Sequence, residues 1–90
     1  MMAHYYLITF ESTYLAIRTE RMLKEKYKVT MIPTPRDLSA SCGLSLMLEA
    51  EALEPACLDL QEPGYEGMHL YKVTRIGSEP RQYEELEWRI

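Results

Sequence analysis

The stretch MIPTPRDLSASCGLSLMLE, residues 31–49, contains the feature that decides the fold. It starts at the end of one apolar segment and passes through a run of proline, serine and threonine. A second apolar segment follows at once, and residues 44–49 alternate leucine with serine and methionine. This period of two predicts a strand. We therefore expect a strand, a loop and a strand, and the rest of the chain to be arranged around them.

Upstream of this pair, the sequence predicts a strand and a helix. Residues 5–10, YYLITF, are aromatic and β-branched, which is typical of a strand. Ser12 is a suitable helix N-cap, and apolar side chains then recur at helical spacing. Residues 28–32 form the strand that Pro33 ends. The stripe expected to face the core contains Leu15, Thr19, Met22, Leu23 and Tyr27.

Downstream, a second helix and a last strand are expected. Leu53, Ala56, Cys57 and Leu60 share one helical face, and Pro55 falls in the first turn, where proline is tolerated. The turn EPGYEG precedes a strand over residues 68–76. The order strand-helix-strand-strand-helix-strand predicts an α+β, ferredoxin-like βαββαβ fold, with two helices on one face of a four-stranded antiparallel sheet.

The division of the chain is also predicted. Residues 1–76 would form the ferredoxin-like domain, and the break at residues 77–80, GSEP, would start a C-terminal tail over residues 77–90. Tyr83, Leu86 and Ile90 have helical spacing, so we expect a short helix or a partner-binding segment there.

Composition excludes several classes of protein. The net charge of -4 and pI near 5.1 argue against a nucleic-acid surface, which is normally basic. No apolar stretch is long enough to span a membrane, and the first residues do not resemble an export signal. We therefore expect a cytoplasmic protein whose two cysteines are reduced. Neither a metal site nor a cofactor is indicated, because the cysteines and histidines lack paired spacing and no phosphate loop or dinucleotide fingerprint is present.

Cys42 is the candidate reactive residue. In the predicted sheet the third strand lies between the first two, so its start is beside the end of the first strand and the start of the first helix at Ser12 and Thr13. The N-terminus of a helix favours a nearby thiolate. If the loop residues 35–41 formed a helical turn, however, Cys42 would lie at its negative end. Whether the thiol is exposed decides the matter, and we expect it to be uncovered.

Neighbouring residues fit a reactive thiol in different ways. Arg36 would add positive charge, Gly43 would let the backbone approach whatever the sulfur carries, and Ser41 would leave space. By contrast, Cys57 is expected in the core, and His69 is expected to be structural rather than a general base.

Three longer segments resemble a known family. The segment IPTPRDLSASCGLSL, residues 32–46, resembles the signature of the selenium/sulfur carrier-like family of small bacterial domains, and the opening YYLITFESTYLAIRTERMLK and the ending YEGMHLYKV are similar too. The resemblance covers about residues 4–75. It implies a sulfur or selenium carrier with Cys42 as the carrying thiol, framed by Gly43 and the Pro33-Thr34-Pro35 loop. Its partners would be donor and acceptor proteins, and it would be at most sulfurtransferase-like as an enzyme. Unlike the Cys-Pro-x-Pro element of better-known small sulfurtransferases, here the prolines precede the cysteine.

An alternative class is a non-catalytic, homodimeric interaction module. Both faces of the predicted sheet carry apolar residues, while the helices cover only one, and a bare apolar face on a domain usually meets a partner or a second copy. We expect a homodimer, or coverage of that face by the tail. The tail residues able to cover it are Tyr83, Leu86, Trp88 and Ile90. RNA stacking on the sheet is disfavoured by the charge and by the absence of a Lys/Arg-Gly-aromatic element.

Overall fold

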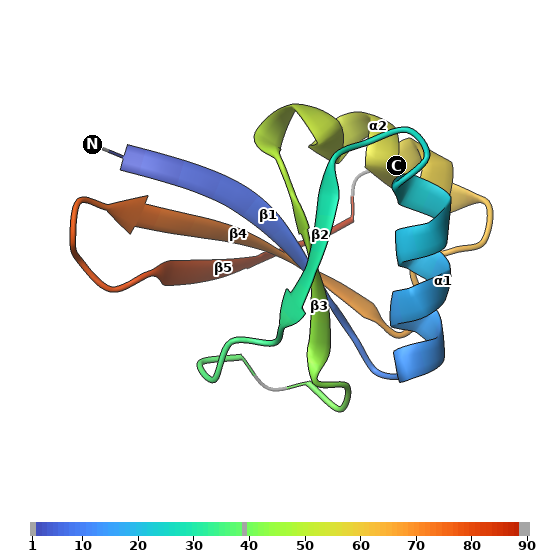
Figure 1. Ribbon diagram of the computed structural model, residues 1–90, viewed down its shortest axis with the longest axis horizontal. Coiled ribbons are helices and arrows are strands. Elements are labelled where there is room, and N and C mark those ends of the chain that lie inside the picture. The colour runs from blue at the N-terminus through green and yellow to red at the C-terminus, as the bar shows by residue number, and fades with distance from the viewer. Residues whose placement is uncertain (1, 39, 89–90) are drawn as a thin grey trace.

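The computed structural model describes residues 2–38 and 40–88, which fold into a sheet with two helices packed on it (Figure 1). The elements in chain order are β1 (Met2–Phe10), α1 (Thr13–Leu23), β2 (Val29–Pro33), β3 (Leu44–Leu48), the short 3₁₀ helix η1 (Ala50–Ala52), α2 (Leu53–Gln61), β4 (Met68–Ile76) and β5 (Gln82–Leu86). The class is α+β, as predicted.

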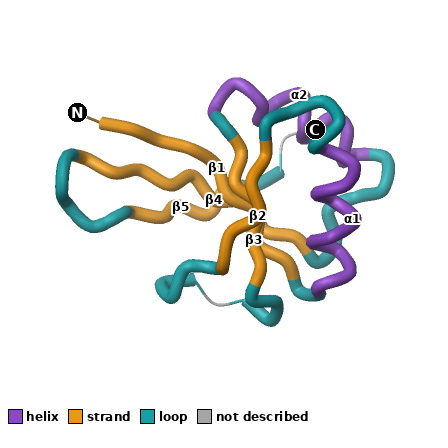
Figure 2. The backbone as a smooth tube through the Cα atoms, viewed as in Figure 1, coloured by secondary structure: helices purple, strands orange, loops and turns teal. Residues whose placement is uncertain are grey.

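The sheet has five strands in the order β2-β3-β1-β4-β5, and every neighbouring pair is antiparallel. β3 lies between β1 and β2, as the sequence predicted. The predicted count of four strands is wrong, because β5 extends the sheet beyond β4. Helices α1 and α2 lie together on one side, while the β4–β5 hairpin extends away from them (Figures 1 and 2).

The C-terminal segment is a strand, so the predicted short helix is wrong. The helical spacing of Tyr83 and Leu86 carried that prediction, and Ile90 lies outside the described residues. β4 is nine residues long, and without β5 one of its edges would be unpaired. A turn at Gly77 brings residues 82–86 alongside that edge, and the ladder it completes outweighs the weak strand preference of this glutamate-rich segment. The division at residue 76 stays a prediction.

The tail docks on its own chain through one aromatic pair. The indole ring of Trp88 stacks on Tyr65 with ring centroids 4.4 Å apart, and its Nε1 donates a hydrogen bond to the carbonyl of Met68 at 3.1 Å. Leu86 also packs against the core. The end of β5 is therefore fixed to the turn that precedes β4, on the helical side of the sheet.

The core lies between the sheet and the helices, as the helical patterns predicted. Ile8, Leu46 and Leu70 are register neighbours on three adjacent strands, and all three are fully or almost fully buried. Thr19 and Leu23 of α1 are buried against them. The predicted core face of α2 is confirmed, with Leu53, Ala56, Cys57 and Leu60 all buried.

The other face of the sheet is covered within one chain more than expected. Leu7 and Val73 are fully buried although no helix lies over them. Val73 pairs with Tyr5 on one side and Tyr83 on the other, so both rings share its face and are half-buried. Tyr83 thus takes the predicted covering role, whereas Leu86 and Trp88 pack on the helical side. A second copy on this face stays a prediction.

A hydrogen bond joins the two helices in addition to their apolar contacts. Tyr27, after the end of α1, donates its hydroxyl to Asp59 of α2 at 2.7 Å, and Lys26 lies 3.4 Å from the same carboxylate. The Tyr27 hydroxyl, more than the Lys26 charge, holds the pKa of Asp59 below its ordinary value. The same hydrogen bond raises the pKa of Tyr27.

The Tyr27–Asp59 hydrogen bond predicts a contribution to folding stability that is lost in acid. Because the pKa of Asp59 is lower in the folded chain than in the unfolded chain, the stabilisation is present above the ordinary value of about 4 and is lost as the pH falls through the folded pKa. Asp59→Asn should therefore narrow the difference in free energy of unfolding between pH 7 and pH 3, measured by urea denaturation. Tyr27→Phe should narrow it as well. If the difference in free energy of unfolding between pH 7 and pH 3 were unchanged in both variants, the Tyr27–Asp59 hydrogen bond would not contribute to stability.

Candidate functional site

Cys42 lies where three connections of the chain meet, as the topology predicted. Its backbone N–H donates to the carbonyl of Phe10, the last residue of β1, at 3.2 Å. The next residue, Glu11, donates its N–H to the carbonyl of Gly67 at 2.9 Å, just before β4 begins. We call this edge of the sheet the Cys42 rim: it consists of residues 10–13, residues 42–44 and residues 67–68.

The start of α1 forms one wall of the Cys42 rim. Ser12 is the N-cap, as predicted, and its Oγ accepts a hydrogen bond from the N–H of Leu15 at 3.2 Å. This cap fixes the direction of the first turn, and Thr13 is the first helical residue. The Oγ1 of Thr13 lies 3.6 Å from the Sγ of Cys42. The predicted proximity of the thiol to Ser12 and Thr13 at the helix N-terminus is therefore present.

Two polar groups that can donate hydrogen bonds face the sulfur of Cys42. Besides the Thr13 hydroxyl, the backbone N–H of Leu44 points to the Cys42 Sγ with a nitrogen–sulfur distance of 3.4 Å. A neutral thiol can either donate to the Thr13 hydroxyl or accept from it, whereas a thiolate can only accept. In the thiolate form, both the Thr13 hydroxyl and the Leu44 N–H would therefore donate to the charged sulfur. The arrangement is one that can hold a sulfur anion, and the Leu44 amide is a contributor that sequence reasoning did not name.

The expectation that Cys42 is uncovered is wrong, since the residue is only 4% exposed. It belongs to the same apolar cluster as Phe10, Leu46 and Met68, which carry the core up to the edge of the sheet. Small neighbours in the loop do not leave the sulfur open, because the end of β1 and the start of α1 close over it. Any reaction of this thiol therefore requires the rim to open locally.

The loop between β2 and β3 is held by Thr34 rather than by a helical turn. Its N–H donates to the carbonyl of Gly43 at 2.9 Å, and its Oγ1 lies 3.2 Å from the carbonyl of Cys42 and 2.7 Å from the Oγ of Ser45. A carbonyl can only accept, so the single Thr34 proton goes to Cys42 and the Ser45 hydroxyl donates to Thr34. This chain of hydrogen bonds fastens the loop to fully buried Ser45.

The helical turn considered for residues 35–41 is absent from the described residues of this loop. A single bond from the N–H of Leu38 to the carbonyl of Pro35, at 3.1 Å, closes a tight turn instead. Cys42 therefore does not lie at the C-terminal end of a helix, and the opposing dipole considered from the sequence does not arise.

Thr34→Val is expected to make Cys42 react faster. The variant removes the hydroxyl that joins Ser45 to Cys42 and leaves a buried serine without its acceptor, at a cost of about 1–3 kcal/mol. If this cost lowers the free energy of locally opening the Cys42 rim by about 1.4 kcal/mol, the alkylation rate of Cys42 rises about tenfold. The measurement is iodoacetamide labelling followed by peptide mass analysis, with Cys57 as the internal reference.

Thr30→Val is the matched control, because Thr30 is exposed on β2. Equal acceleration of Cys42 and Cys57 in Thr34→Val would mean that the whole domain was destabilised, and would contradict a local role for Thr34.

The remaining predicted residues lie on the outer surface of the loop. Arg36, Ser41 and Gly43 are all exposed. Within residues 2–38 and 40–88, Arg36 makes no hydrogen bond or ion pair with Cys42. A methyl group added at Gly43 would meet no atom within 4 Å, so there is open space beside the cysteine. The binding roles of these residues stay predictions. The sequence analysis named Thr34 only as part of the Pro33-Thr34-Pro35 loop, and the polar side chain at Ser45 was the signal that could have revealed its partner.

His69 lies on β4 between two carboxylates. Its Nε2 is 3.1 Å from Glu11 and its Nδ1 is 3.3 Å from Glu85, so it links the end of β1 to β5. The two ring nitrogens point to different partners, which fits the structural role predicted for it.

Searches for other kinds of site give negative results. Across the part of the chain that the structure describes, no group of three or more ligating side chains could hold a metal ion. Neither described helix has the length and apolar character needed to cross a membrane.

Comparisons with known proteins give one match. No curated protein and no solved structure matches the chain. A protein-family model with the description "Putative Se/S carrier protein-like" matches residues 5–72, which run from within β1 to the middle of β4 and include the whole Cys42 rim. The chain therefore belongs to the selenium/sulfur carrier-like family.

Proposed function

We propose that this protein carries sulfur or selenium on Cys42, taking it from a donor protein and giving it to an acceptor protein. The observation that supports this most directly is the pair of polar groups that face one sulfur atom: the Leu44 amide, which donates to it, and the Thr13 hydroxyl, which would donate to a thiolate. Membership of the carrier-like family supports the chemical class. A reducing compartment such as the cytoplasm would suit the role, because it would keep the unloaded thiol reduced.

The chemistry requires only a thiol exchange. The Cys42 thiolate attacks the terminal sulfur of a donor persulfide, R–S–SH, forming the bond from Cys42 Sγ to that sulfur and breaking the bond to the donor. The products are Cys42–S–SH and the donor thiolate R–S⁻, so no external oxidant or reductant is consumed. A donor perselenide would transfer selenium in the same way, giving Cys42–S–SeH. The acceptor reverses the step.

The burial of Cys42 has a role in this scheme. A terminal persulfide is exposed to other thiols and is lost when they attack it, and a closed rim excludes them. Opening of the rim is needed for loading and release. Open space beside Gly43 is the nearest route for a second sulfur atom.

The test is a loading experiment. The wild-type chain is incubated with a cysteine desulfurase and cysteine, and the intact mass is measured without reductant. We expect an added mass of about 32 Da, the mass of one sulfur atom transferred by thiol exchange. Peptide mass analysis should place this sulfur on Cys42. An unmodified chain, or a sulfur found on Cys57, would contradict the carrier function.

The alternative of a homodimeric interaction module is favoured by one observation, the 4% exposure of Cys42. If Cys42 serves only as a core residue, its alkylation should be as slow as that of Cys57, and the function would lie in the sheet face opposite the helices. Sedimentation of the wild-type chain as a dimer, together with equally slow thiols, would support the module over the carrier.

A further inference from the structure

The outward face of α1 carries apolar and basic side chains together. Tyr14 is 70% exposed and Ile17 is 41% exposed, and these are two of the four exposed large hydrophobic residues in the part of the chain described. Arg18 and Arg21 continue the same helical face, at the i+4 and i+7 positions from Tyr14. We call Tyr14, Ile17, Arg18 and Arg21 the α1 face. Together with Met22 and Glu25 they border a depression of about 430 Å³.

The positive charge of the α1 face is not neutralised. Neither Arg18 nor Arg21 makes an ion pair among residues 2–38 and 40–88, and the Nε of Arg18 is buried without a hydrogen-bond partner. Positions 18–28 hold five basic and two acidic residues in a chain of net charge -4, and two of the five, Lys26 and Lys28, are paired with Asp59 and Glu49. The two unpaired arginines thus place positive charge on the outward side of α1, which is the complement of an acidic partner.

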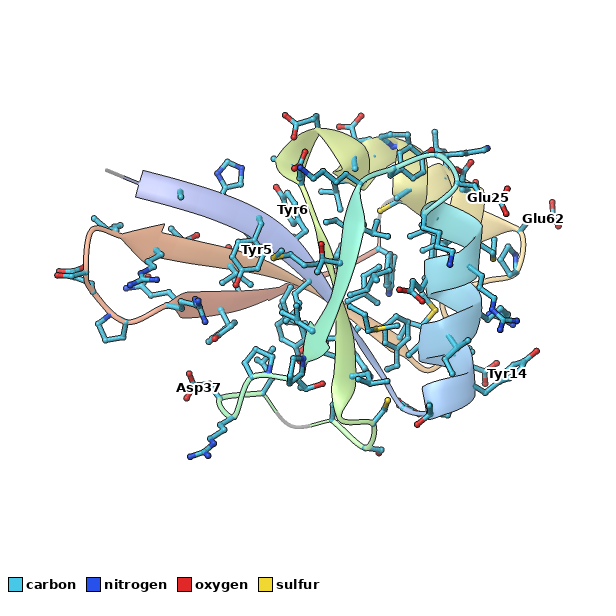
Figure 3. All side chains as sticks on the ribbon, viewed as in Figure 1. Tyr5, Tyr6, Tyr14, Glu25, Asp37 and Glu62 are labelled. Atoms are coloured by element: carbon cyan, nitrogen blue, oxygen red, sulfur yellow. The ribbon has the colours of Figure 1, made fainter. Side chains whose placement is uncertain are left out.

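The side chains are also partly ordered before any partner arrives. The guanidinium carbon of Arg18 lies 5.9 Å from the centre of the Tyr14 ring, within the range of a cation–π contact. Tyrosine and arginine are the residue types that contribute most to protein interfaces. Figure 3 shows Tyr14 projecting away from the body of the molecule at the first turn of α1.

The α1 face adjoins the carrier thiol in sequence and in space. Tyr14 follows Thr13, whose hydroxyl is 3.6 Å from the Cys42 Sγ. A protein seated on the outer side of α1 would press on the helix whose first residue closes over the thiol. Contact there is thus placed to bring a reactive sulfur to the Cys42 rim and to loosen the rim itself.

We propose that the α1 face is the docking surface for the sulfur donor, a protein that presents acidic side chains around an apolar contact next to its persulfide. This inference rests on the proposed carrier function of Cys42. It assigns recognition to Tyr14, Ile17, Arg18 and Arg21, and leaves Cys42 to perform the transfer.

The experiment compares two ways of loading the same cysteine. A cysteine desulfurase of acidic net charge, supplied with cysteine, loads Cys42 by protein contact, and inorganic polysulfide loads it without one. Ile17→Glu and Arg21→Glu are expected to slow loading by the desulfurase at least tenfold and to leave loading by polysulfide unchanged. Loading of the wild type by the desulfurase should also slow as salt is raised.

Matched controls separate a specific surface from a general effect of charge. Leu58→Glu changes an apolar residue of α2 that is 59% exposed, and Arg75→Glu makes the same charge change on the exposed end of β4. Both should load within twofold of the wild type. Equal slowing of the controls and the α1 variants would overturn the proposal, as would no slowing in any of the four.

Other outcomes identify a different occupant or a different failure. Dimerisation of the wild type that Ile17→Glu abolishes, or flotation with phosphatidylserine vesicles that Arg21→Glu abolishes, would overturn the proposal in favour of a second copy or a membrane. A wild type loaded by polysulfide but not by the desulfurase would overturn the docking surface and leave the carrier function standing. A wild type that neither reagent loads on Cys42 would overturn both.

Discussion

Cys42→Ala is expected to abolish sulfur loading completely. The variant removes the only atom that the proposal allows to form the new sulfur–sulfur bond, so the added mass of about 32 Da should disappear rather than decrease. Thr13 and Leu44 would still be present, but a hydroxyl and an amide cannot hold a sulfur atom at this oxidation level. The measurement is intact mass after incubation with a cysteine desulfurase and cysteine.

The matched variant is Cys57→Ala. Cys57 is as buried as Cys42, being 2% exposed against 4%, so the two substitutions remove similar buried side chains. Each should cost about 1 kcal/mol, as is usual for a single core substitution, and circular dichroism would establish that both variants fold. Retained sulfur loading in Cys42→Ala, or lost sulfur loading in Cys57→Ala, would contradict the assignment of Cys42 as the carrying thiol.

Gly67→Ala is expected to be the most destabilising of the substitutions considered. Gly67 has φ +79°, which non-glycine residues adopt at a cost of about 1–2 kcal/mol. An added Cβ would lie 2.7 Å from the Cδ1 of Leu15. Leu15 is half-buried and would have to leave its rotamer, at a further cost of about 0.5–1.5 kcal/mol. The combined loss of about 1.5–3.5 kcal/mol corresponds to a melting temperature lower by roughly 6–28 °C for a domain of this size.

Two variants isolate the clash from the backbone strain. Gly64→Ala imposes the strain without the contact, because φ is +96° and no atom lies within 4 Å of the added Cβ. Leu15→Ala in the Gly67→Ala background should restore part of the stability, and a double-mutant cycle would measure that coupling. If Gly64→Ala and Gly67→Ala proved equally destabilising, the close approach of α1 to Gly67 would carry no energy.

The sequence predicted the elements that follow from local pattern. The core faces of both helices, the Ser12 cap and the position of β3 between β1 and β2 are present because each depends on hydrophobic spacing or on a short-range hydrogen bond. The rim of three connections was predicted as well, since chain topology alone places Phe10 beside Cys42.

The errors arise where distant parts of the chain decide the structure. Gln82–Leu86 form a strand because β4 offers a free edge, which no local pattern in a glutamate-rich segment reveals. Cys42 is buried because Phe10, Leu46 and Met68 extend the core to the sheet edge, whereas the polar sequence around it indicated an open loop. The hydrogen bonds of Thr34 with Cys42 and Ser45 were missed because they join residues eight and eleven positions apart, which no local pattern reveals.

The match to the family model ends at residue 72, in the middle of β4, yet β5 pairs with residues 70–74. A chain shortened to the family boundary would lose both the covering strand and the Trp88–Tyr65 stack, and would display a row of unsatisfied amides and carbonyls. Such a border is a template for fibril-like self-association. β5 thus replaces the nine-residue edge of β4 with a five-residue edge that carries Glu84 and Glu85, and short, charged edge strands discourage pairing with another chain.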